Sequence, residues 1–248
     1  MPPSGSPSVT HPKLPERQLL YAVGDIHGRL DLLQRLLEII RRDAEASRAD
    51  RRTLVFLGDY VDRGPDSRAV VERLLGDLPQ GFDVHFLKGN HEAILLDFLA
   101  EPWRLDHWLQ NGGEETMRSY GVDTQRLAQL GSPPSAWRDA FSEALPEAHL
   151  RFFRNLQLSV SFGDYLFVHA GLRPGVPLEA QSEADLVWIR APFLDHAEPF
   201  GKVVVHGHTP GEEPVTRSNR VGIDTGAVFT GRLTALRLED GSRKFLQT

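Results

Sequence analysis

The segment Leu19-Leu20-Tyr21-Ala22-Val23-Gly24-Asp25-Ile26-His27-Gly28 passes directly from apolar residues to side chains that can bind metal ions. The run from Leu19 to Val23 is typical of a buried strand. Glycines on either side of Asp25 and His27 permit a sharp turn and a close approach of the backbone. The segment therefore predicts a strand whose carboxyl end carries ionisable chemistry.

The same arrangement recurs four more times along the chain. Asp, His and Asn together form an oxygen-and-nitrogen donor set, which suits hard or borderline divalent metals. Packing alone does not explain five such strand ends, and together they predict a two-metal hydrolase. The other four segments are Gly58-Asp59-Tyr60-Val61-Asp62-Arg63-Gly64, Gly89-Asn90-His91-Glu92, Val168-His169-Ala170-Gly171 and His206-Gly207-His208-Thr209-Pro210.

Helical patterns follow the first three expected strands, at residues 30–46, 67–75 and 92–99, with Ser67 as the expected N-cap of the second helix. This alternation predicts a largely parallel sheet with right-handed crossovers. Residues from 103 to about 155 are expected to form a helical insertion. Strands return after residue 158, so the expected fold class is α/β, with two sheets sandwiched between helices.

The composition of the 248-residue chain is that of a globular protein, with 40% hydrophobic and 25% charged residues. Its net charge of −6 favours neither nucleic acid nor an anionic membrane as a partner. The lack of cysteine excludes disulfides and thiolate metal sites and fits a cytoplasmic location. We expect residues 1–17, rich in proline and serine, to be a disordered tail, and residues 18–248 to be one catalytic domain.

In their order, these motifs resemble those of the phosphoprotein-phosphatase branch of the calcineurin-like metallophosphoesterases. The chain is most similar to the small bacterial and bacteriophage lambda-type Ser/Thr phosphatases, over about residues 19–238. The resemblance implies a four-layer α/β/β/α sandwich of two mixed sheets flanked by helices. Further matching segments are His107-Trp108-Leu109, Asn111-Gly112-Gly113, Trp188-Ile189-Arg190 and Ile223-Asp224-Thr225-Gly226-Ala227-Val228-Phe229.

The resemblance also implies a ligand set for two divalent ions. Mn²⁺ is the expected ion, and Fe, Zn or Co would also suit the donors. A water shared by both ions would attack phosphorus directly, without a phosphoenzyme intermediate. Asp25 and His27 would bind the first ion, Asp59 would bridge the two, and Asn90, His169 and His208 would complete the second.

Four further residues have implied roles in catalysis and substrate binding. His91 would be the general acid that protonates the departing alkoxide, and Asp62 would orient and charge its imidazole. Arg63 and Arg190 would clamp phosphate oxygens with their forked guanidinium groups. Asn90, already a ligand, would also lie against the substrate.

Other polar residues are expected to lie outside the site. Strand alternation points His206 and His208 to opposite faces, so we expect His206 to be structural. Lys88 precedes the GNHE motif where lambda-type relatives tend to have arginine, and we do not count it in the site. His85, His107, His149 and His196 are expected to be structural or at the surface.

Three functions remain compatible with the sequence. The first is hydrolysis of phosphoserine or phosphothreonine in proteins. The alternative is hydrolysis of dinucleoside polyphosphates, such as diadenosine tetraphosphate, or of other small phosphoesters. A non-catalytic, metal-dependent scaffold is the third, which the full set of ligands and arginines disfavours. The oligomeric state is left open.

Overall fold

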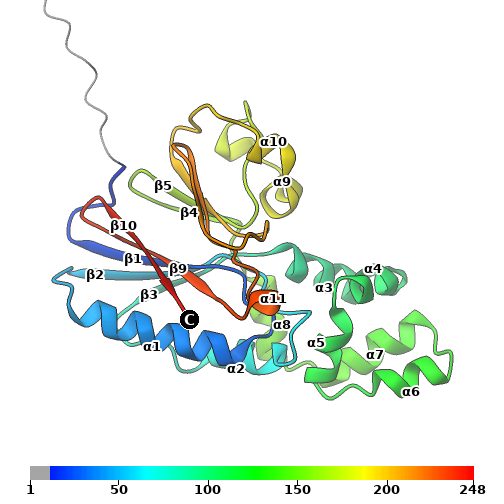
Figure 1. The fold of residues 1–248 in the computed structure, drawn as a ribbon. Coiled ribbons are helices and arrows are strands. Elements are labelled where there is room, and N and C mark those ends of the chain that lie inside the picture. The colour runs from blue at the N-terminus through cyan, green and yellow to red at the C-terminus, as the bar shows by residue number, and fades with distance from the viewer. Residues whose placement is uncertain (1–11) are drawn as a thin grey trace, which may run out of the picture.

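The computed structural model describes residues 12–248, whose strands form two five-stranded sheets (Figure 1). The first sheet has the order β10-β9-β1-β2-β3, with β1, β2 and β3 parallel. The second has the order β4-β5-β6-β8-β7, with β5, β6 and β8 parallel. Both sheets are mixed, as expected. The strands are β1 (Gln18–Val23), β2 (Arg51–Phe56), β3 (Asp83–Phe86), β4 (Ser159–Phe162), β5 (Tyr165–Val168), β6 (Val203–His206), β7 (Val215–Thr216), β8 (Arg220–Gly222), β9 (Thr234–Glu239) and β10 (Ser242–Gln247).

Helices cover the outer faces of both sheets, which confirms the α/β/β/α layering (Figure 1). Helices α1 and α2 lie under the first sheet, and the short α9 and α10 lie over the second. The α-helices are α1 (Leu30–Glu45), α2 (Ser67–Leu75), α3 (Asn90–Ala100), α4 (Leu105–Gln110), α5 (Gly113–Ser119), α6 (Thr124–Gln129), α7 (Pro134–Ala144), α8 (Glu147–Arg154), α9 (Glu183–Trp188), α10 (Ala191–Leu194) and α11 (Ala227–Thr230), with 3-10 turns at η1 (Pro102–Arg104) and η2 (Leu178–Ala180).

Strand β1 shows how the sequence produces these layers. Its side chains alternate, so Leu19, Tyr21 and Val23 face the helices, while Leu20 and Ala22 face the second sheet. Both faces are buried, which explains why the strand is a continuous apolar run. The loops at the carboxyl ends of β1, β2, β3, β5 and β6 then meet between the sheets, because these strands are parallel within each sheet.

The chain between β3 and β4 is helical; α4 to α7 gather at one side of the molecule, and α8 contacts α2 and α3 nearer its centre (Figure 1). The sequence predicted a helical insertion from residue 103 to about residue 155, and the structure has the five helices α4 to α8 there. The buried faces of these helices join the same apolar core as α1 to α3, through residues such as Trp108, Trp137 and Phe153. This region therefore packs onto the sandwich at the end of β3.

One local expectation differs from the structure. Ser67 is the first residue of α2 and not its N-cap, which is Asp66; the Ser67 hydroxyl instead accepts a hydrogen bond from the backbone N–H of Asp62 at 3.1 Å. Within the expected tail, Lys13 pairs its backbone with Asp164 through two 2.9 Å hydrogen bonds. Residues 1–11 of that tail lie outside the described part of the chain.

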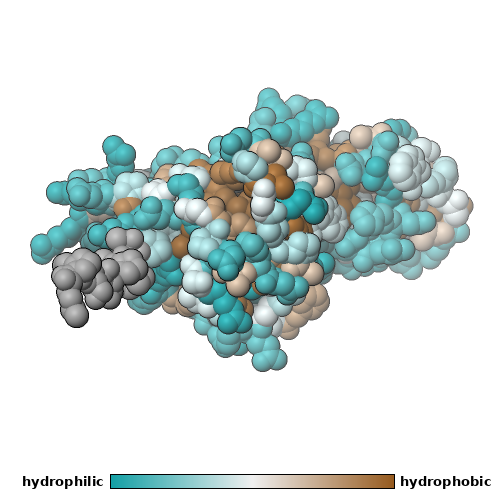
Figure 2. All heavy atoms as spheres, turned by 90° about the horizontal axis from the view of Figure 1, so that it is seen from above, coloured by the Kyte–Doolittle hydropathy of each residue, from teal (hydrophilic) through white to brown (hydrophobic). Residues whose placement is uncertain are grey.

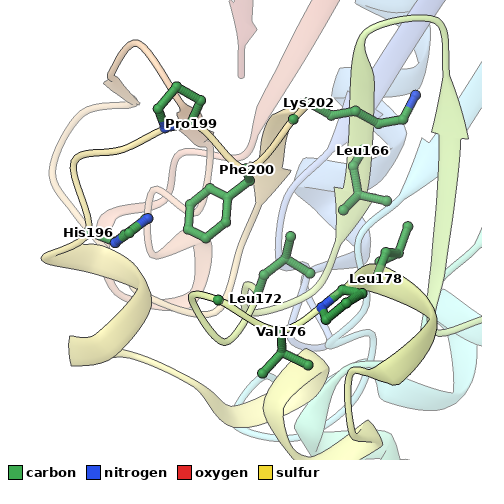
Figure 3. Close-up of a pocket in the computed structure, with 11 residues that line it drawn as sticks. Leu166, Leu172, Val176, Leu178, His196, Pro199, Phe200 and Lys202 are labelled. Carbon is green, nitrogen blue, oxygen red and sulfur yellow. The ribbon is translucent and has the colours of Figure 1, made fainter.

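The outer face of the second sheet is only partly covered by α9 and α10. Viewed from above, hydrophobic residues gather near the middle of this side, among hydrophilic ones (Figure 2). A hollow of about 450 Å³ lies there, with Leu166, Leu172 and Phe200 around it (Figure 3). Its lining includes none of the expected metal ligands. Within residues 12–248, no helix combines the length and the apolar character needed to cross a membrane.

Candidate metal centre

The residues expected to bind metal lie at the carboxyl ends of five strands, and their side chains converge. Two groups of potential donor atoms each fit within 4.8 Å, and Asp59 belongs to both. One group holds His27, Asp59 and His91, and the other holds Asp59, His169 and His208. All of these side chains are buried. The structure thus places two adjacent donor clusters around one carboxylate.

The two oxygens of Asp59 face opposite clusters. Its Oδ2 lies 3.5 Å from Nε2 of His27, and its Oδ1 lies 3.4 Å from Nε2 of His169. A carboxylate in this position can hold one cation with each oxygen, as in two-metal sites. The geometry fits the bridging role expected for Asp59.

Asn90 is the centre of the second cluster. Its side-chain oxygen lies 3.0 Å from Nε2 of His169 and 2.8 Å from Nδ1 of His208. His169 is oriented by the Leu57 carbonyl, 2.9 Å from its Nδ1, so its Nε2 faces the cluster. Three uncharged donors therefore point at one small volume.

Asp25 lies beside both clusters without belonging to either group of three. Its Oδ2 accepts a hydrogen bond from the backbone N–H of His208 at 3.0 Å. Its Oδ1 is buried and has no hydrogen-bond partner among the described residues, as is suitable for an oxygen that binds a cation. A Cβ at Gly207 would lie 2.1 Å from this oxygen, so glycine is required there.

Burial favours the neutral form of three imidazoles expected to bind metal, those of His27, His169 and His208. It lowers the pKa of His27 to about 3 and that of His208 to about 3, and it lowers the pKa of His169 as well. Neutral imidazole is the form that binds a metal ion. Burial also raises the pKa of Asp25, with further contributions from Asp224 and Asp59. Divalent cations would relieve this crowding of carboxylates.

Site residues also hold unusual backbone conformations. His27, Asp59, Asp62, Arg63 and His208 all have φ between +46° and +70°, the left-handed region that non-glycine residues seldom adopt. Each such residue costs free energy that the surrounding structure must offset. This strain is concentrated in the loops that carry the candidate ligands.

His91 and Asp62 form a buried pair. Nδ1 of His91 lies 2.7 Å from Oδ2 of Asp62, and both side chains are fully buried. Burial alone would lower the pKa of His91, but the charges of Asp59 and Asp62 and the hydrogen bond to Asp62 raise it overall. Nε2 of His91 has no partner among residues 12–248 and lies 3.9 Å from Oδ2 of Asp59. It therefore faces the first cluster, where it can either donate a proton or bind an ion.

Both expected arginines lie at the edge of the clusters. Nη1 of Arg63 is 2.8 Å from Nε2 of His27. Arg190 is exposed, and its Nη2 reaches the carbonyl of His208 at 3.4 Å. The two guanidinium groups thus approach from different loops, each next to a candidate ligand.

Two acidic residues near the ligands were not assigned a role from the sequence. Glu92 is buried and binds the backbone N–H groups of Asp59, Tyr60 and Gly89. Asp224 follows β8 and is buried near Asp25, with its Oδ1 bound to the N–H of Gly226 at 2.8 Å. Asp224 follows the apolar residues Val221 and Ile223, the same strand-end pattern that identified the candidate ligands.

His206 lies away from the clusters, as expected, although for a different reason. Strand β6 ends at His206, and the chain then turns, so His208 is not part of an alternating strand. The His206 ring packs edge-on against Phe193 at 5.0 Å. Lys88 likewise points elsewhere and pairs with Glu183 at 2.5 Å.

Comparisons with known proteins relate the chain to one family of phosphoesterases. Residues 19–230 match the family model described as calcineurin-like phosphoesterase. Serine/threonine-protein phosphatase 1 of Salmonella typhimurium is 29% identical over 229 residues, covering 89% of this chain and 92% of that protein. The asymmetrical bis(5'-nucleosyl)-tetraphosphatase PrpE of Anoxybacillus flavithermus is 26% identical over 237 residues, covering 87% and 88%.

Solved structures share the fold at lower identity. A protein provisionally assigned as a diadenosine tetraphosphatase superposes with a TM-score of 0.61 at 22% identity, covering 92% of this chain and 93% of that one. A cold-active protein tyrosine phosphatase superposes with a TM-score of 0.57 at 16% identity, covering 94% and 81%. These likenesses support the sandwich architecture.

Proposed function

The chain belongs to the calcineurin-like phosphoesterase family, and we propose that it hydrolyses phosphoserine and phosphothreonine in proteins. The family and the phosphatase relatives make it a metal-dependent phosphoester hydrolase. The observation that carries the finer proposal is the buried His91–Asp62 pair beside the donor clusters. A serine or threonine alkoxide is a poor leaving group, so a general acid contributes most to that reaction.

We assign Asp25, His27 and Asp59 to a first divalent ion, and Asp59, Asn90, His169 and His208 to a second. The converging neutral donors and the unpartnered Oδ1 of Asp25 support this assignment. When bound, such ions activate water and offset the charge of the phosphate. Mn²⁺ is the ion we expect, and Fe, Zn or Co also suit these ligands.

The remaining residues bind the substrate and move a proton. Arg63 and Arg190 orient the phosphate oxygens, and Asn90 contributes a further polar contact. His91 holds a proton at Nε2 and gives it to the leaving oxygen, while Asp62 stabilises the charged imidazole through Nδ1. Replacing His91 with Asn should lower turnover strongly and leave two metal ions bound. Loss of an ion in that variant would make His91 a ligand instead.

A second candidate is the hydrolysis of dinucleoside polyphosphates, and two exposed aromatic rings favour it. Phe229 on α11 is 73% exposed, and its ring centroid lies 6.0 Å from Cζ of Arg63. Trp188 at the end of α9 is 38% exposed and packs edge-on against His208 at 6.1 Å. Rings beside a phosphate site could stack on adenine, and the PrpE relative is named for such a substrate.

A comparison of rates separates the two candidates. The protein would be assayed with Mn²⁺ on a phosphoserine peptide, p-nitrophenyl phosphate and diadenosine tetraphosphate. The first proposal predicts that kcat/KM for the peptide exceeds that for the dinucleotide by at least about tenfold. The reverse ratio, together with a raised KM for the dinucleotide in Phe229→Ala, would establish the second candidate. Hydrolysis of none of the three would overturn both.

A further inference from the structure

The carboxylate of Asp62 is held by three side chains at once. Its Oδ2 is bound by Nδ1 of His91 at 2.7 Å, and its Oδ1 accepts a hydrogen bond from the hydroxyl of Thr116 at 2.6 Å. Nε1 of Trp108 lies 3.1 Å from both oxygens. All four side chains are fully buried. A buried carboxylate with this many donors has one available orientation.

The hydroxyl of Thr116 also holds the backbone of Asp62. It accepts a hydrogen bond from the Asp62 N–H at 2.8 Å, and it lies 3.1 Å from the hydroxyl of Ser67. Asp62 has a φ of +70°, which is unfavourable for a residue with a side chain. One hydroxyl therefore fixes both the strained backbone and the carboxylate of the same residue.

These contacts come from the helical region that follows β3. Trp108 lies on α4 and Thr116 on α5, and the turn between the two helices also touches the site. The carbonyl of Gly112 in this turn accepts a hydrogen bond from the Arg63 N–H at 3.1 Å. A Cβ at Gly112 would lie 2.6 Å from that nitrogen, so the turn approaches the Asp62–Arg63 loop as closely as glycine allows.

We propose that Trp108 and Thr116 are positioning residues for the Asp62–His91 pair, so that the helices α4 and α5 complete the catalytic centre. This inference rests on the proposed general-acid role of His91. Asp62 can direct the His91 ring only if its own carboxylate cannot rotate. The ring is then held with Nε2 toward the donor clusters, where the leaving oxygen must receive its proton.

The dependence of rate on the leaving group tests this inference. An alkoxide from phosphoserine needs a proton in the transition state, whereas p-nitrophenolate departs without one. Thr116→Val should therefore lower kcat on a phosphoserine peptide by about 10- to 100-fold, and lower kcat on p-nitrophenyl phosphate by less than about threefold. KM and a content of two metal ions per chain should not change. Thr116→Ser keeps the hydroxyl and should restore most of the peptide activity.

Three further variants make the test decisive. Trp108→Phe keeps an aromatic ring against Phe98 and Phe141 but removes the N–H donor; it should show the same selective loss, and it serves if Thr116→Val does not fold. Thr124→Val is the matched control, because Thr124 is equally buried in this region but its hydroxyl accepts from Arg118. In a His91→Asn background, Thr116→Val should cause no further loss, because both changes act through one group.

The opposite results would overturn the inference. Equal losses on both substrates, equal behaviour of Thr116→Ser and Thr116→Val, or an additive loss in the His91→Asn background would each assign the hydroxyl a purely structural role. Failure of the proposed function looks different: the wild-type protein itself would then not hydrolyse the phosphopeptide, whatever the variants did with p-nitrophenyl phosphate.

Discussion

The carboxylate of Glu92 accepts a hydrogen bond from the backbone N–H of Asp59 at 3.0 Å, and thereby ties the first turn of α3 to the residue that both donor clusters share. The same side chain binds the N–H groups of Tyr60 at 2.8 Å and Gly89 at 3.0 Å. Asp59 has a φ of +53° and needs such support. Glu92 therefore holds Asp59 in position, although its own carboxylate belongs to neither donor cluster.

Replacement of Glu92 by Gln should destabilise the protein and weaken metal binding. Glutamine has one acceptor oxygen in place of two, so its amide N–H₂ would face a buried backbone N–H. The unfolding free energy should fall by about 2 kcal/mol, and Tm by about 4–8 °C for a chain of this size. Chemical denaturation measures the first effect and metal titration the second.

Glu45→Gln is a suitable control, since Glu45 is an exposed residue of α1 paired with Arg41. Loss of the Glu45–Arg41 ion pair should change the unfolding free energy by less than about 0.5 kcal/mol. Equal stability and metal affinity in Glu92→Gln and Glu45→Gln would show that Glu92 does not support the site.

The family and the strand ends could be predicted from sequence because each is a local signal. An apolar run followed by a short segment that holds both glycine and polar residues identified the ends of β1, β2, β3, β5 and β6 without knowledge of their neighbours. The fold then follows from parallel pairing, since it brings such ends to one edge of each sheet. The confirmed layering rests on the alternation of side chains that β1 displays.

Contacts between distant segments were not predictable in this way. Thr116 and Asp62 are 54 residues apart, and nothing in the threonine's own surroundings in the sequence indicates that it binds a carboxylate. His206 illustrates a different case. It lies outside the donor clusters, as expected, but strand alternation is not the reason, because β6 ends at His206 and His208 lies in the turn that follows. Short helices such as α9 and α10 lack a long apolar period, so periodicity did not identify them.

Removal of metal ions should abolish hydrolysis, because the proposed centre has no other means to activate water. EDTA treatment should eliminate activity, and Mn²⁺ should restore it. Asp59→Asn should lower the occupancy of both sites, whereas Asp25→Asn should mainly affect one, since only Asp59 lies in both donor groups. Elemental analysis of the purified variants measures this. Two ions per chain in Asp59→Asn would exclude the bridging role.

His149 should make stability depend on pH. Its Nδ1 lies 2.8 Å from the hydroxyl oxygen of Tyr120, and Glu72 and Arg68 are the charged groups that act on it. Burial lowers the pKa of His149 below its usual value near 6.5. As pH falls below 6.5 the unfolded chain takes up the proton first, so the stabilisation present above 6.5 is lost toward the lower folded-state pKa.

The measurement is the unfolding free energy at pH 7.5 and pH 5 for the wild type and for His149→Phe. The wild type should lose more stability than the variant over this interval, because only the wild type has a histidine at this position to protonate on unfolding. Identical pH dependence in the wild type and His149→Phe would refute the role of His149.

Variants of Arg63 and Arg190 should lose phosphate binding and keep metal binding. Nη1 of Arg63 lies 2.8 Å from Nε2 of His27, and Nη2 of Arg190 reaches the carbonyl of His208 at 3.4 Å, so each guanidinium is next to a candidate ligand without belonging to the proposed ligand set. Replacing either with Ala removes a charge-assisted contact to phosphate, worth about 2–4 kcal/mol where water is excluded.

We therefore expect kcat/KM to fall by about 10²- to 10³-fold in Arg63→Ala and in Arg190→Ala, at about tenfold per 1.4 kcal/mol. Lysine at either position should recover only part of this loss, because a point charge cannot reproduce the two-pronged contact of a guanidinium. Metal content should stay at the wild-type value in all four variants. Wild-type activity of Arg190→Ala on a phosphopeptide would mean that the exposed Arg190 does not contact the phosphate, and that Arg63 acts with a different partner.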